Sequence, residues 1–141
     1  MTGTEFIEHF ERGLEPGDEF HHADHVHLAF AYLCEYPVLL ALEKFGGALR
    51  RFATARGRPQ LYNETITCVY FFLIRERMVR CVGADWEDFA RRNPDLLVWR
   101  GGILSHYYRE GTLQSDLARE VFVLPDKYLD LRTSGSLVCR Q

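Results

Sequence analysis

Four of the six histidines in this 141-residue chain lie within seven positions, in the segment FHHADHVH at residues 20–27. Neutral imidazole is the commonest protein ligand for zinc, iron and copper, so this density predicts a metal site. If a helix begins near His22, the side chains of His22 and His25 share one of its faces. They supply two ligands, whereas a catalytic metal centre usually has three protein ligands and one open position.

The third ligand that we expect is Glu64, in the segment YNETIT at residues 62–67. If the helices that begin near His22 and near Glu64 pack against each other at their starts, Glu64 meets His22 and His25. Two histidines and one carboxylate form the ligand set of non-haem iron enzymes and of some zinc enzymes. The sequence therefore predicts a catalytic site made of His22, His25 and Glu64.

The other members of this site follow from the same reasoning. Asp24 is expected to orient one of the imidazoles, and His21 and His106 are less favoured metal ligands. The cofactor would be a divalent metal (zinc, iron or copper), with haem as a less favoured alternative. The substrate would be a small organic molecule, undergoing hydrolysis or hydration with zinc and oxidation with iron or copper. The residues expected to line its pocket are Tyr62, Asn63, Thr67 and Tyr70.

Three alternatives compete with a metal enzyme. The protein could be a non-catalytic carrier or sensor of a metal or haem. It could be a metal-free enzyme, in which His22 or His25 acts as general base beside Asp24 or Glu64. It could also be an interaction module with surface histidines. Glu64 has a structural explanation as well, because a carboxylate in the first turn of a helix is stabilised by the helix dipole.

Composition and the absence of motifs narrow the function classes. The chain has 17 Lys and Arg against 20 Asp and Glu, a net charge of −3, which argues against a nucleic-acid surface. It contains no glycine-rich nucleotide loop, no HExxH motif and no apolar run that would span a membrane. The four cysteines form no CxxC pair, and the first residues do not resemble a signal peptide, so we expect a cytoplasmic protein.

Hydrophobic periodicity predicts an all-α fold, a single compact domain of residues 1–141 built as a bundle of about five to seven helices. The longest apolar helix, 63–80, is expected to be the central buried one. A chain this short buries a smaller fraction of its surface, so such a helix could also form half of the core of a homodimer. Residues 126–141 are expected to form a flexible tail. The expected helices cover residues 5–12, 22–36, 37–56, 63–80, 85–93, 103–108 and 115–122.

Three segments carry a resemblance to a known group. FHHADH at 20–25, LYNETIT at 61–67 and FVLPD at 122–126 resemble motifs of a group of small uncharacterised bacterial proteins, all helical and of about this length. The resemblance covers most of the chain and implies no settled activity. In that group the residue before the ETIT motif is often His, whereas this chain has Asn63. If that His is a ligand there, either the metal set differs here or the chemistry needs no metal.

Overall fold

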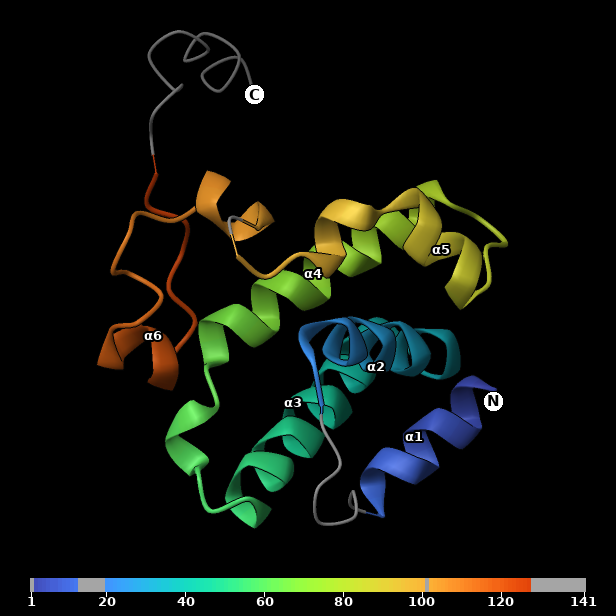
Figure 1. Cartoon of the computed structure of the whole chain (residues 1–141), viewed down its shortest axis with the longest axis horizontal. Coiled ribbons are helices and arrows are strands. Elements are labelled where there is room, and N and C mark those ends of the chain that lie inside the picture. The colour runs from blue at the N-terminus through green and yellow to red at the C-terminus, as the bar shows by residue number, and fades with distance from the viewer. Residues whose placement is uncertain (1, 13–19, 101, 128–141) are drawn as a thin grey trace, which may run out of the picture.

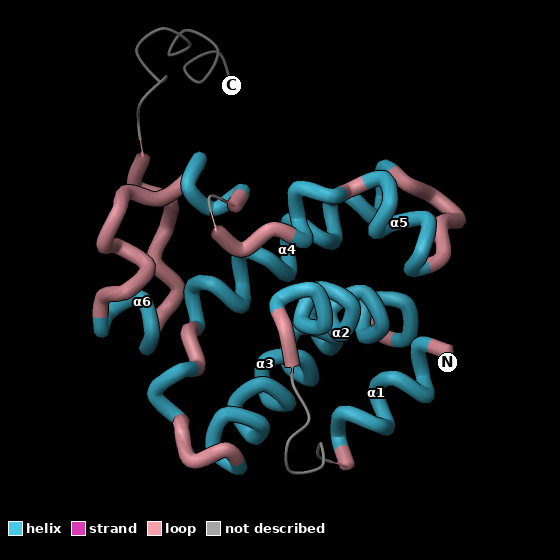
Figure 2. Tube along the Cα trace, in the orientation of Figure 1, coloured by secondary structure: helices cyan, strands magenta, loops and turns pink. Residues whose placement is uncertain are grey.

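The computed structural model describes residues 2–12, 20–100 and 102–127, and all regular structure in these residues is helical (Figures 1 and 2). The predicted all-α class is confirmed. The α-helices are α1 (Gly3–Glu11), α2 (His22–Glu35), α3 (Val38–Ala55), α4 (Glu64–Arg80), α5 (Trp86–Arg92) and α6 (Asp116–Glu120). Short 3₁₀ helices, labelled η, are η1 (Pro59–Leu61), η2 (Pro94–Leu97) and η3 (Ile103–His106). None of the described helices is long and apolar enough to cross a membrane.

Helix starts in this fold are set by side-chain caps. The α1 start is a capping box, in which the Thr2 hydroxyl accepts from the Glu5 amide and the Glu5 carboxylate accepts from the Thr2 amide. The helix therefore begins two residues before the predicted position. Asp85 and Ser115 cap α5 and α6 in the same way, by accepting from the amide three residues on.

Helix α2 lies at the centre of the fold and packs against α1, α3, α4 and η2 (Figure 1). Six of its residues are buried, among them Leu28, Ala29 and Tyr32. The prediction that α4 would be the central helix, apolar and buried almost all round, is wrong. Phe72 and Val79 of α4 are 44% and 54% exposed, because only one side of that helix meets the core.

A stack of three rings joins α1, α2 and α5. The imidazole of His27 lies between the rings of Phe6 and Trp86, with centroids 4.0 and 4.3 Å away and interplanar angles of 12° and 2°. Burial lowers the pKa of His27 to about 4, so its ring is neutral near pH 7. The stack thus holds the first helix to the rest of the fold through flat apolar contact.

The end of the described chain is extended and lies beside the start of α4. The Thr65 hydroxyl donates to the Val121 carbonyl (2.8 Å) and accepts from the Val123 amide (3.0 Å), while the Tyr108 hydroxyl donates to the Val123 carbonyl (2.6 Å). The predicted helix 115–122 therefore ends at Glu120, since the backbone at 121–123 bonds to side chains instead. The predicted helix 103–108 is also shorter than expected and covers Ile103–His106.

The predicted flexible tail lies almost wholly outside the described residues. Of residues 126–141, the structure describes Asp126 and Lys127, and both are bonded. The Asp126 carboxylate accepts from the Arg109 amide (2.8 Å) and from the Thr112 hydroxyl (2.6 Å), and Lys127 donates to the Ser105 carbonyl (2.8 Å). These two residues of the predicted tail are thus held by hydrogen bonds to residues 105–112.

Candidate functional site

His22, in the first turn of α2, lies half-buried against the segment that contains η2. Its Nε2 atom is 2.9 Å from the Leu96 carbonyl oxygen. A carbonyl can only accept, so Nε2 carries the hydrogen and Nδ1 keeps a lone pair in the neutral ring. Burial lowers the pKa of His22, while the Leu96 carbonyl opposes that shift, and the ring is neutral near pH 7. His22 therefore has the state that a general base needs.

His25 has a different environment. Its ring packs on Phe20, with centroids 4.6 Å apart. Burial, helped by the nearby His22, lowers the pKa of His25 to about 4. At neutral pH His25 is thus an uncharged packing residue.

Asp24 does not take the predicted role of orienting His22 or His25. Its carboxylate accepts from the backbone amide of His21 (2.9 Å) and lies 3.8 Å from the imidazole of that residue. Asp24 therefore serves the first turn of α2, where a carboxylate is favourable.

Glu64, the first residue of α4, is held by two residues that are not the predicted histidine partners. Its Oε1 atom accepts from Arg50 of α3 (2.9 Å) and from the Tyr62 hydroxyl (2.6 Å), and the Arg50 guanidinium lies over the Tyr62 ring. These contacts join α3 to the start of α4. Gly46 of α3 makes this close approach feasible, since a Cβ there would lie 3.3 Å from the Tyr62 hydroxyl.

The predicted metal centre of His22, His25 and Glu64 is not formed. Across the described ranges, no three His, Cys, Asp or Glu side chains lie close enough together to hold a metal ion, which includes the less favoured His21 and His106. The physical reason is that Leu96 engages the imidazole of His22, whereas Arg50 engages Glu64. His22 and Glu64, which were predicted to bind the same metal, thus each bind a different residue.

Three of the four predicted pocket residues are structural. Asn63 caps α4 by accepting from the Ile66 amide (2.9 Å) and donates to the Leu113 carbonyl (2.7 Å). Tyr62 bonds to Glu64, and Thr67 is buried in α4. Together with Thr65, these contacts give the YNETIT segment a structural role at the junction of α3, α4 and the chain end.

Tyr70, the fourth predicted pocket residue, has a buried hydroxyl without a hydrogen-bond partner among the described residues. Only 5% of the residue is exposed, and burial raises the pKa of its hydroxyl to about 12, so the phenol stays protonated. The ring lies edge-on to His22 (4.7 Å between centroids) and is tilted against Trp99 (6.2 Å).

Gly102 lines a surface hollow and lies close to the Tyr70 hydroxyl, although Tyr70 is not among the residues that line the hollow. A Cβ at residue 102 would lie 3.3 Å from that hydroxyl and 2.9 Å from the Trp99 carbonyl oxygen, and it would collide with the carbonyl oxygen of Val98. Only glycine fits this position, because the atom that would clash most is backbone.

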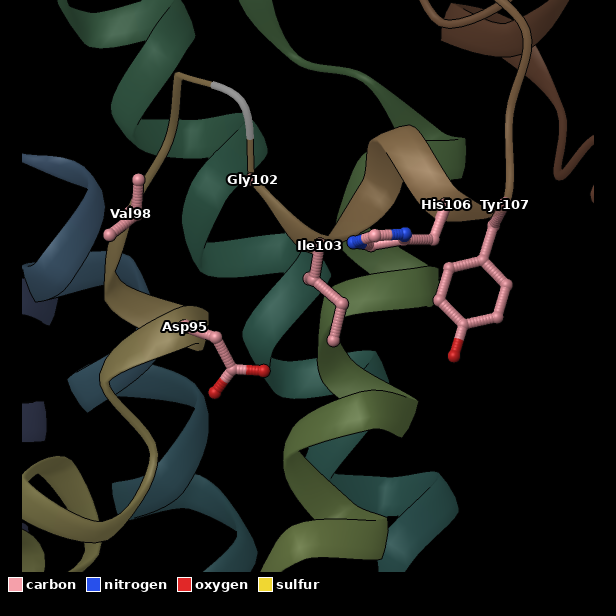
Figure 3. A pocket seen from close by; sticks show the side chains of 6 residues that line it. All are labelled: Asp95, Val98, Gly102, Ile103, His106 and Tyr107. Carbon is pink, nitrogen blue, oxygen red and sulfur yellow. The ribbon is translucent and has the colours of Figure 1, made fainter.

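The hollow has a volume of about 380 Å³ and is open to solvent. In the view of Figure 3, Ile103 lies between Asp95 and His106. Arg77 of α4 binds both oxygens of Asp95, at 2.7 and 3.0 Å, and also the Asn93 side chain (2.8 Å). Arg77 thereby fixes the position of η2. The residues that line the hollow are Asp95, Val98, Gly102, Ile103, His106 and Tyr107.

Sequence reasoning missed most of this hollow. It named His106, which lines the hollow, as a less favoured metal ligand, and it expected Tyr70, which lies close to Gly102, in a pocket. It gave Asp95 and Gly102 no role in a site. One signal for the location was available, namely a tyrosine in the middle of an apolar helix, whose hydroxyl must find a partner.

No protein-family model matches the chain, and no curated protein or solved structure is detectably similar to it.

Proposed function

We propose that the protein binds a small organic molecule in the hollow lined by residues of η2 and η3 together with Val98, Gly102 and Tyr107. The observation that carries this proposal is the hollow itself, whose lining residue Gly102 lies close to the buried Tyr70 hydroxyl, a group without a partner among the described residues. A buried hydroxyl without a hydrogen bond costs about 1–3 kcal/mol. Native proteins retain such a cost most often near functional sites.

The size and lining of the hollow agree with such a ligand. Its volume of about 380 Å³ lies at the small end of the range for ligand sites, roughly 300–1,000 Å³. Val98 and Ile103 contribute apolar surface, and His106 and Tyr107 contribute polar groups. This mixture favours a compact, partly apolar molecule.

A second candidate function is a metal-free enzyme that uses acid–base chemistry. His22 favours it, because its neutral ring has a lone pair at Nδ1 and lies against Tyr70, which keeps its proton. In this version the partner of the histidine is Tyr70, in place of the predicted Asp24 or Glu64. The metal-dependent enzyme, with zinc, iron, copper or haem, stays a prediction from sequence.

A fragment screen followed by two-dimensional NMR tests the binding proposal. Several hundred small neutral, anionic and cationic fragments would be added to the ¹⁵N-labelled chain. We expect a subset to move the amide resonances of Gly102, Ile103 and Tyr107. The proposal fails if no fragment moves these resonances at millimolar concentration.

Two tryptophan substitutions on exposed valines give a matched control. Val98→Trp would fill the hollow and abolish the shifts, because Val98 lines it and is 50% exposed. Val79→Trp would leave the shifts unchanged, because Val79 is 54% exposed on α4 and is not part of the lining. Equal effects of the two substitutions would contradict the assignment of the site.

A further inference from the structure

We infer that two copies of the chain associate by pairing residues 121–124 as antiparallel strands across a two-fold axis. This inference goes beyond the proposed function, because none of these residues lines the hollow. Residues 121–124, with the sequence VFVL, belong to the red segment that follows α6 in Figure 1. Three observations carry the inference: the unpaired backbone of this segment, its exposed apolar side chains and its lack of charge.

One edge of this segment is already hydrogen-bonded. The Val121 carbonyl and the Val123 amide both bond to the Thr65 hydroxyl, and the Val123 carbonyl accepts from Tyr108. The dihedral angles of Val121, φ −135° and ψ 164°, lie in the β region. Alternate residues of a strand direct their N–H and C=O groups to opposite edges. Because residues 121 and 123 face Thr65 and Tyr108, the backbone groups of residues 122 and 124 face the other way.

The opposite edge offers hydrogen-bond donors and acceptors that are not in use. They are the N–H and C=O groups of Phe122 and Leu124, and no residue in the described part of the chain bonds to them. Buried backbone groups are almost always paired, so these groups meet solvent, in agreement with the exposed side chains of both residues. Such an unpaired edge is a template for another extended chain.

The same edge of a second copy supplies the matching groups. In an antiparallel pair related by a two-fold axis, Phe122 of each copy would lie opposite Leu124 of the other. Residues opposed in this way exchange both of their N–H···O bonds, so every outward backbone group of both copies gains a partner. Val123 of one copy would then lie opposite Val123 of the other, at the axis.

The side chains around this edge favour an apolar, uncharged partner. Large apolar side chains are exposed on and beside it, a grouping that marks interaction surfaces. They are Leu117, Val121, Phe122 and Leu124.

The charges near the edge do not oppose the approach of a second copy. Residues 121–125 (VFVLP) carry no charge, and the net charge of the whole chain is only −3, so two copies repel each other weakly. Of the flanking carboxylates, Glu120 is the last residue of α6, outside the extended segment. The other, Asp126, is held by the Arg109 amide and the Thr112 hydroxyl.

The oligomeric state in solution tests the inference. So short a pairing predicts a weak dimer, with a dissociation constant on the order of 100 µM. We therefore expect translational diffusion, measured by NMR, to slow as the concentration of the wild-type chain rises from about 10 µM to about 1 mM. In a mixture of ¹³C-labelled and unlabelled chains, an isotope-filtered NOE should join the Hα atoms of Val123 in the two copies, since the Cα atoms of such a pair lie about 4.5 Å apart.

Three substitutions separate backbone pairing from apolar contact. Leu124→Pro removes an outward N–H and keeps the inward bonds of Val123, so it should weaken the dimer at least about 10-fold. Leu124→Ala keeps that N–H and should weaken the dimer less. Leu39→Ala is the matched control and should leave the dimer unchanged, because Leu39 is also 70% exposed but lies in α3. Unchanged amide resonances of Thr65 and Tyr108 would show that Leu124→Pro is folded.

The inference is overturned if the wild-type chain stays monomeric at about 1 mM, or if a dimer forms without the contact between the two Val123 residues. It is also overturned if Leu124→Ala weakens the dimer as much as Leu124→Pro, since apolar contact alone would then explain association. An equal effect of Leu39→Ala would place the interface elsewhere and overturn it too.

Discussion

The imidazole of His22 meets the ring of Tyr70 at an interplanar angle of 64°, with centroids 4.7 Å apart. One partner comes from the first turn of α2 and the other from the middle of α4, so the contact joins the central helix to α4. A neutral base and a protonated phenol are thereby placed together.

The first prediction concerns stability without a ligand. Tyr70→Phe should raise the free energy of unfolding by about 1 kcal/mol, because it removes a buried hydroxyl that lacks a partner. Tyr108→Phe is the matched control and should lower it by about 1 kcal/mol, since the Tyr108 hydroxyl donates to the Val123 carbonyl. Urea unfolding measures both. A loss in Tyr70→Phe similar to that in Tyr108→Phe would show that the Tyr70 hydroxyl is satisfied.

The second prediction concerns acid. The pKa values of His25 and His27 are lowered from 6.5 to about 4 in the folded chain. Their contribution to stability is therefore fully present above pH 6.5 and is lost as the pH falls through 4. We expect the free energy of unfolding to fall by about 2 kcal/mol between pH 7 and pH 4. This is less than the two pKa shifts would give at about 1.36 kcal/mol per pKa unit, because both rings are partly exposed.

The substitution His27→Phe isolates the contribution of His27 to this dependence of stability on pH. The variant keeps a flat ring between Phe6 and Trp86 but has no group to titrate. Its stability should therefore depend less steeply on pH between 6.5 and 4 than that of the wild type. An unchanged slope would show that protonation of His27 costs nothing in the folded state.

The third prediction concerns the support of the hollow. Arg77→Gln should lower the free energy of unfolding by about 1–2 kcal/mol, since it removes bonds to both Asn93 and Asp95. It should also shift the NMR resonances of His22, because η2 presents the Leu96 carbonyl to that ring. Arg80→Gln is the control and should change stability by less than about 0.5 kcal/mol, as its partner Glu76 is exposed. Equal effects of the two substitutions would contradict this role of Arg77.

The fourth prediction separates a structural Glu64 from a metal ligand. A double-mutant cycle between Glu64→Gln and Arg50→Gln should give a coupling energy of about 0.5–1 kcal/mol, because the pair is partly exposed. Treatment with EDTA before unfolding should leave that coupling unchanged. A coupling that disappears with EDTA, or a metal bound in equal amount to the protein and lost with Glu64→Gln, would restore the metal site predicted from sequence.

Local signals in the sequence predicted the helices well. Pro37 separates α2 from α3, and Asn63 and Asp85 cap helices at the predicted starts, because caps and proline act on the backbone within a few residues. Ile103–His106 is 3₁₀ helix, within a stretch that was predicted as helix. The central helix was misassigned, because hydrophobic content does not show which side of a helix meets the core.

The site was predicted only in part, because spacing along the chain does not choose partners across the fold. Imidazole can bind a metal or donate to a carbonyl, and a carboxylate can bind a metal or an arginine. His22 is hydrogen-bonded to the Leu96 carbonyl, and Glu64 is bonded to Arg50. Both partners come from segments whose position depends on how the helices pack. Tyr70, predicted as a pocket residue, lies next to Gly102 of the hollow, but its hydroxyl is buried and it does not line the hollow.

Trp86 in the ring stack around His27 can serve as a fluorescent probe of that stack. The chain has two tryptophans, Trp86 in that stack and Trp99 beside the hollow. A variant that keeps only Trp86 would report by fluorescence on whether the first helix is docked. A variant that keeps only Trp99 would report on the hollow, so detachment of α1 and occupation of the site could be followed separately in the same protein.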